Sequence, residues 1–196
     1  AALVDMVDRP DLLVVGALLH DIGKGYPGDH TEVGMELVAT IAPRMGFDAA
    51  DTATLIELVR LHLLLPEVAT RRDLSDDATL AGVASEVGDD ATLRLLHALT
   101  VADSEATGPA AWGTWKAQLV EELVDRTAAV LGGYAPDDVA TSSRFPTDEE
   151  RRRTRRELPE GPASDNRLRN ATRGLPRLEK RRRSTILGLP PLHRGR

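Results

Sequence analysis

The sequence predicts an all-α fold. Apolar residues recur at intervals of three and four along residues 11–131, which is the spacing of one face of a helix. No apolar run alternates with polar residues in the way that indicates a strand. Glycines, prolines and capping aspartates divide this region into segments of ordinary helical length. We therefore expect a helical bundle with short connections.

Each predicted helix has a start or stop signal. The first stops before Gly25, and Asp29 begins the second with Glu32 three residues later, as in a capping box. Gly46 ends the second helix, and Pro66 is predicted to close the third. The predicted helices cover residues 11–24, 29–45, 50–65, 75–88, 89–108 and 112–131.

The charge pattern divides the chain into an acidic body and a basic end. Residues 1–147 contain 10 Lys and Arg against 24 Asp and Glu, whereas residues 148–196 contain 15 against 7. We predict a folded domain over 1–135, a linker with a short charged helix over 136–158, and a disordered basic tail over 159–196. The acidic body disfavours a nucleic-acid partner.

Composition excludes several classes of protein. The chain has no cysteine, so disulfides and thiolate metal sites are excluded. It has no apolar run of membrane-spanning length and no signal peptide, so we expect a cytoplasmic protein without a membrane partner.

Polar side chains with ligand chemistry fall on the apolar faces of several predicted helices. His20 and Asp21 follow the apolar run that begins at Leu12. His62 shares a face with Leu55 and Leu58, and Asp103 shares one with Leu96 and Leu99. We therefore expect the side chains of these four residues to point toward the same part of the interior.

A shared metal ion explains this arrangement. Burying such groups without partners is costly, and coordination keeps Asp ionised and His neutral. A lone histidine on an apolar face is more often a hydrogen-bonded core residue, but four such groups together favour a metal site. Nitrogen and oxygen ligands suit a divalent cation that activates water. His97 lies on the opposite side of its helix from Asp103, and we expect it at the surface.

The motifs resemble those of a known family. His20-Asp21-Ile22-Gly23-Lys24 is similar to the signature of the HD superfamily of metal-dependent phosphohydrolases. Ala-Thr-Arg-Arg-Asp at 69–73 and Ala-Asp-Ser-Glu-Ala-Thr-Gly-Pro at 102–109 are more specific. They resemble the bifunctional uridylyltransferase/uridylyl-removing enzymes that act on the nitrogen-regulatory PII protein. The resemblance covers about residues 1–157, in the segments 20–25, 28–34, 61–63, 69–74, 99–109 and 112–116.

The resemblance implies a phosphodiesterase reaction and a role for each matching residue. The expected reaction is hydrolysis of the uridylyl-tyrosine bond of PII, with release of UMP and with Mg²⁺ or Mn²⁺ as cofactor. The implied residues are His20, Asp21 and Asp103 as metal ligands, Lys24, His30 and His62 as catalytic groups, and Arg71 and Arg72 as substrate-binding groups. Trp112 and Trp115 are expected to pack against the core.

The chain also departs from the family pattern. No histidine precedes His20, although the family has one on the preceding helix, and the nucleotidyltransferase and ligand-sensing domains are absent. We therefore expect an N-terminally truncated fragment that binds metal weakly, since losing a ligand costs at least about 10- to 100-fold in affinity. Two alternatives stay open: an HD phosphohydrolase of free nucleotides, and a non-catalytic interaction domain.

Overall fold

The computed structural model describes residues 4–108, 112–142 and 145–157. Within these ranges the chain is helical and contains no strand, which confirms the predicted all-α class. The predicted tail, residues 159–196, lies outside the described ranges. The elements are η1 (Val4–Met6), α1 (Pro10–Leu19), α2 (His30–Arg44), α3 (Ala49–Leu61), α4 (Leu64–Arg71), α5 (Asp77–Val87), α6 (Asp90–Thr107), α7 (Thr114–Leu131), α8 (Pro136–Ala140) and α9 (Asp148–Glu157).

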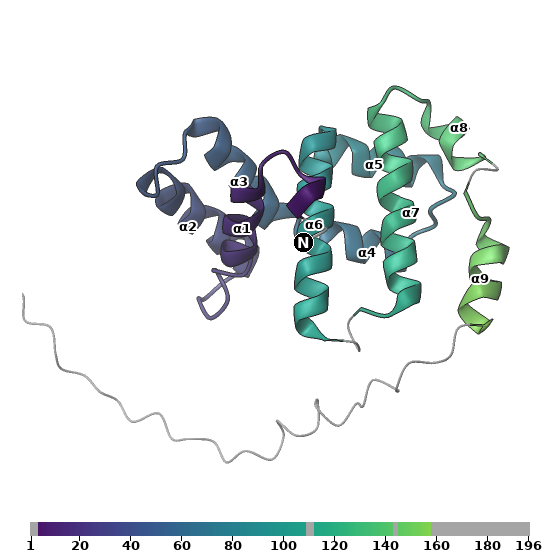
Figure 1. Cartoon of the computed structure of the whole chain (residues 1–196), viewed down its shortest axis with the longest axis horizontal. Helices are drawn as coiled ribbons and strands as arrows, with labels where there is room; N and C mark the ends of the chain where they lie inside the picture. The colour runs from purple at the N-terminus through teal and green to yellow at the C-terminus, as the bar shows by residue number, and fades with distance from the viewer. Residues whose placement is uncertain (1–3, 109–111, 143–144, 158–196) are drawn as a thin grey trace, which may run out of the picture. The chain divides into compact units, whose positions relative to one another are not determined.

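Helix α6 is the centre of the bundle. It contacts α1 and α3 on one side and α7 and α4 on the other, as Figure 1 shows. Helices α2 and α3 pair with each other, while α4 and α5 both pack against α7. Most of the circumference of α6 is buried. The buried side chains include Leu93, Leu95, Leu96, Ala98, Leu99 and Thr100.

Leucine and valine build the core. The chain has only two Phe, two Tyr and two Trp, so aliphatic side chains must supply the buried apolar area that stabilises the fold. Trp112 and Trp115 are partly buried and pack against this core, as predicted from their spacing.

The first helix is shorter than predicted. We expected it to continue to Lys24, but α1 ends at Leu19, and residues 20–25 form turns that lead into α2. A side chain at Gly23 would place its Cβ 2.0 Å from the His30 carbonyl oxygen. The chain therefore leaves the helix so that this turn can lie directly against the start of α2, a contact that local periodicity does not reveal.

The role predicted for Pro66 was wrong. Helix α3 ends at Leu61, and Pro66 lies in the first turn of a further helix, α4. Proline is tolerated there because the first backbone N–H groups of a helix have no acceptor within it. The fifth helix begins at Asp77 rather than Ser75, and the Asp76 side chain accepts a hydrogen bond from the backbone of Ala78.

A buried arginine on α7 holds α8 and the residues just before α9. Arg126 is 1% exposed, and its guanidinium donates to the backbone carbonyls of Val139, Ala140 and Pro146 at 3.2–3.4 Å. Its Cζ also lies 4.5 Å from the centre of the Phe145 ring. The predicted charged helix is present as α9. The proposed domain boundary at residue 135 stays a prediction.

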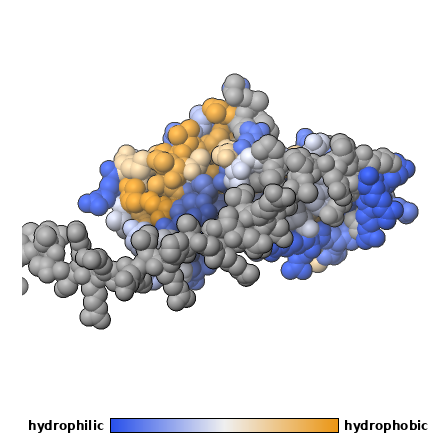
Figure 2. Space-filling view, turned by 90° about the horizontal axis from the view of Figure 1, so that it is seen from below, coloured by the Kyte–Doolittle hydropathy of each residue, from blue (hydrophilic) through white to orange (hydrophobic). Residues whose placement is uncertain are grey.

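Some apolar surface remains exposed on α1. Val14 and Leu18, one turn apart, are 62% and 73% exposed. Figure 2 shows apolar residues gathered on the part of the surface that contains α1 to α3. Of the helices in the described ranges, none has both the length and the apolar character needed to cross a bilayer.

Candidate metal centre

The two residues of the His-Asp pair lie in the turn that follows α1. The backbone N–H of His20 still donates to the Gly16 carbonyl at 2.8 Å, so the last turn of the helix fixes its position. Gly16 permits a close approach to α3, since a Cβ there would lie 2.7 Å from Leu58 Cδ1. These contacts place the pair against the end of α3.

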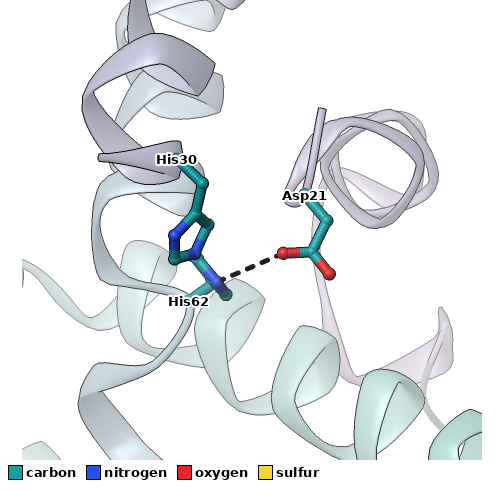
Figure 3. A group of neighbouring side chains, drawn as sticks. All are labelled: Asp21, His30 and His62. Carbon is teal, nitrogen blue, oxygen red and sulfur yellow. Dashed lines mark ion pairs between the residues drawn. The ribbon is translucent and has the colours of Figure 1, made fainter. Parts of the chain in front are cut away.

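Two further histidines reach the same place from α2 and α3. His30 is the first residue of α2, and the Asp29 side chain caps this helix by accepting from Thr31 N at 2.8 Å and Glu32 N at 3.1 Å. His62 directly follows α3 and is 7% exposed. Figure 3 shows His30 and His62 next to each other and opposite Asp21.

Ligand atoms converge closely. Among the described residues, Asp21, His30 and His62 offer ligand atoms that all lie within 4.8 Å of one another, a group that could hold a metal ion. His62 Nε2 lies 3.7 Å from Asp21 Oδ1. His20 Nε2 lies 3.2 Å from Asp21 Oδ2 and 3.5 Å from Asp103 Oδ1. The structure thus brings together all five predicted histidines and aspartates of the centre, from four different segments.

Both inner imidazoles are oriented as metal ligands. His20 Nδ1 lies 2.8 Å from the Ala17 carbonyl, and His62 Nδ1 lies 2.7 Å from the Val59 carbonyl. A carbonyl can only accept, so Nδ1 carries the proton and Nε2 presents a lone pair to the centre. Ligating histidines commonly donate their second N–H to a backbone carbonyl in this way.

Two buried polar atoms without hydrogen-bond partners fit a metal site. His20 Nε2 and Asp21 Oδ1 are buried and have no hydrogen-bond partner. Unpartnered buried acceptors are costly, and both atoms accept rather than donate. A positively charged ligand would satisfy both, so the residues fit a divalent metal.

The protonation states also favour metal binding. Partial burial by itself would raise the pKa of Asp21, but the Lys24 hydrogen bond and the nearby imidazoles outweigh it, and this pKa lies below its ordinary value. Burial lowers the pKa of His62, and its bond to Val59 opposes this only in part. Asp21 is therefore ionised and His62 neutral near pH 7, which is the state that binds metal.

The predicted cationic residues have different surroundings. Lys24 Nζ lies 2.5 Å from Asp21 Oδ2, so it forms an ion pair at the edge of the centre. Arg71 lines a cavity of about 320 Å³ together with Asp103 and Lys116. Arg72 lines a different cavity, beside Trp115 and Arg152. The structure therefore places Arg71, and not Arg72, in the cavity that reaches the centre.

The surface position predicted for His97 was wrong. It is half-buried between α6 and α7, and burial lowers its pKa although Glu121 and Asp125 on α7 oppose the shift. The helix that carries it is buried on several sides, and a single-face interpretation of α6 could not reveal this.

Comparisons with known proteins agree with the motifs. A family model described as HD domain matches residues 2–107. A bifunctional uridylyltransferase/uridylyl-removing enzyme of Streptomyces coelicolor is 56% identical over 152 residues, which are 78% of this chain and 18% of that relative. Proteins with the same name from Mycobacterium tuberculosis and Bordetella bronchiseptica are 53% and 46% identical, over 68% and 69% of this chain and 17% and 16% of theirs. The chain thus spans less than a fifth of the length of these relatives. No solved structure matches the chain.

Proposed function

Because the chain belongs to the HD domain family, we propose that it hydrolyses the uridylyl-tyrosine phosphodiester of the PII protein and releases UMP. The relatives named as uridylyl-removing enzymes support this substrate, since they match well beyond the short His-Asp pair. The observation that carries the proposal is the convergence of His20, Asp21 and Asp103 with two buried acceptor atoms that lack a partner.

The proposed cofactor is Mg²⁺ or Mn²⁺, held by His20, Asp21 and Asp103. A divalent cation in this position would activate water and polarise the phosphodiester. His30 and His62 lie close enough to Asp21 to serve as further ligands or to contact the phosphate. The ligand set mixes imidazole nitrogen with carboxylate oxygen, which suits these two ions better than Ca²⁺.

The protein's own groups position and neutralise the substrate. In the reaction, a water oxygen forms a bond to phosphorus while the bond from phosphorus to the tyrosine oxygen breaks. Arg71, beside Asp103, would bind a phosphate oxygen, and a guanidinium can do so with two hydrogen bonds. Lys24 is 64% exposed and its ammonium lies against Asp21 at the edge of the centre, so it could neutralise charge on the phosphate. Stabilisation of developing charge by fixed groups is commonly the largest catalytic contribution.

The decisive experiment measures UMP release from uridylylated PII. The Asp21→Ala variant should lose hydrolysis while its circular dichroism spectrum stays that of a helical protein. Asp138→Ala is the matched control, because Asp138 is an exposed aspartate on α8. Full activity of Asp21→Ala would refute the mechanism. Hydrolysis of free nucleotides but not of uridylylated PII would instead support the alternative HD phosphohydrolase, and metal-free protein without activity would support an interaction domain.

A further inference from the structure

A second cavity lies where α4, α7 and α9 meet. It has a volume of about 370 Å³ and is lined by four arginines and one carboxylate, that of Asp73. The arginines are Arg71, Arg72, Arg151 and Arg152. Arg71 and Arg72 come from the acidic part of the chain, residues 1–147, whereas Arg151 and Arg152 come from the basic residues that follow it.

One of the arginines that line this cavity, Arg151, belongs to a buried charge cluster. Glu122 Oε1 is shared by two guanidiniums: Arg126 Nε at 2.9 Å and Arg151 Nη1 at 2.5 Å. The side chains of Arg126, Glu122 and Arg151 are only 1%, 8% and 10% exposed. The next carboxylate, Asp73, lies 3.7 Å from Arg151 and is 51% exposed, so solvent weakens its contribution. Arg151 therefore contributes to the cavity wall a guanidinium that Glu122 and Asp73 hold in place.

The rim adds two more cations. Arg72 and Arg152 are exposed, and neither forms an ion pair with any carboxylate of the described residues. By contrast, Arg60 and Arg94 are each paired with an acidic side chain on their own helix. Unpaired guanidiniums around a concave site match the geometry of phosphate, which accepts paired hydrogen bonds from a guanidinium.

An aromatic side chain in the cavity could contact the part of a ligand that is not phosphate. Trp115 and Leu119 line it next to the arginines, and Trp115 is only partly buried. We propose that this cavity binds a small organic phosphate, with Arg72, Arg151 and Arg152 around the phosphate and Trp115 against the organic part. This site is separate from the metal centre, although Arg71 lines both this cavity and the one beside Asp103.

The test measures binding to the full chain in the presence of EDTA. The probes are UMP, inorganic phosphate and uridine. Their binding is measured by calorimetry on the unmodified chain and by fluorescence of a Trp112→Phe variant, in which Trp115 is the only tryptophan. UMP and phosphate should bind, UMP should quench Trp115, and uridine should bind at least about tenfold more weakly than UMP. Raising the salt concentration should weaken binding, since the contacts are ionic.

Variants assign the binding to this cavity. The double variant Arg72→Gln/Arg152→Gln should weaken UMP binding at least about tenfold, which corresponds to about 1.4 kcal/mol. Arg94→Gln is the control, since Arg94 is an exposed arginine paired with Asp90 on α6. Asp21→Asn should leave UMP binding unchanged, so failure of this proposal is distinguishable from failure of the proposed hydrolysis. The proposal is overturned if UMP does not bind, if uridine binds as well as UMP, or if the double variant binds UMP like the control.

Discussion

Replacing Gly23 by alanine should damage the metal centre without altering any of its proposed ligands. Gly23 lies in the turn between α1 and α2, where the new Cβ would lie 2.0 Å from the His30 carbonyl oxygen and 2.7 Å from Gly34 N. Both neighbours are backbone atoms of α2, so they cannot rotate away as the end of a side chain would. The turn and the helix must separate by more than about 1 Å to reach ordinary contact.

The size of the effect follows from this overlap. Overpacking in a dense interior costs about 1–3 kcal/mol, and a backbone clash belongs at the upper end of that range. For a domain of this size, about 3 kcal/mol lowers the melting temperature by about 6–12 °C. The same separation moves His20 and Asp21 away from His30, so affinity for Mn²⁺ should fall at least about tenfold.

Gly34 and Gly82, which both lie inside helices, provide matched controls. Gly34→Ala would bring Cβ within 2.9 Å of Val59 Cγ1, a side-chain methyl that can shift, so we expect a smaller loss. Gly82, inside α5, has nothing within 4 Å of an added Cβ. Gly82→Ala should therefore stabilise the protein by about 0.5–1 kcal/mol, because alanine loses less backbone entropy in a helix.

Urea unfolding followed by circular dichroism gives the three free energies, and calorimetry with Mn²⁺ gives the affinities. The expected order of stability is Gly82→Ala, then Gly34→Ala, then Gly23→Ala. If Gly23→Ala unfolded at the same urea concentration as the other two and bound Mn²⁺ like the unmodified chain, the close approach of turn and helix would not be what assembles the centre.

Three further outcomes are expected. Glu122→Gln removes the carboxylate shared by two buried arginines and should lower the free energy of unfolding in urea by about 3–5 kcal/mol. Arg94→Gln, at an exposed ion pair, should lower it by less than about 0.5 kcal/mol, and equal losses would contradict the buried charge cluster. His97 has a lowered pKa in the folded protein, so its contribution to stability is present above the ordinary pKa of 6.5 and is lost as the pH falls through the folded pKa. His97→Gln should therefore flatten the decline of unfolding free energy with falling pH. An unchanged slope would show that His97 is not desolvated. Mn²⁺ at 100 times its dissociation constant should raise the unfolding free energy by about 2.7 kcal/mol, and EDTA should reverse this gain. His20→Ala should remove most of the gain. If Mn²⁺ stabilised that variant to the same extent, the ion would bind elsewhere.

Local signals were sufficient for several helix ends and for the residue types of the metal centre. Asp29 caps α2 as predicted, Asp89 caps α6, and Gly88 follows the end of α5 with a positive φ of 84°. The stripe that carries Leu55, Leu58 and His62 is buried as its spacing predicted. Each of these features depends on residues within two helical turns of one another, so it is encoded locally.

Contacts between distant segments decided what the sequence left open. The end of α1 at Leu19, rather than at Lys24, follows from the packing of residues 20–25 against α2. The half-buried state of His97 depends on how α7 packs against α6, and the structure also decided that Arg71, but not Arg72, lines the cavity beside Asp103.

The sequence by itself determined the all-α class, most helix boundaries and the residue types that can hold a metal. Only the tertiary structure decided that His20, Asp21, His30, His62 and Asp103 surround one small volume, and that two buried arginines share one carboxylate. The physical reason is that periodicity fixes the face on which a side chain lies, whereas the distance between two faces depends on close packing at positions such as Gly16 and Gly23, which no local pattern specifies.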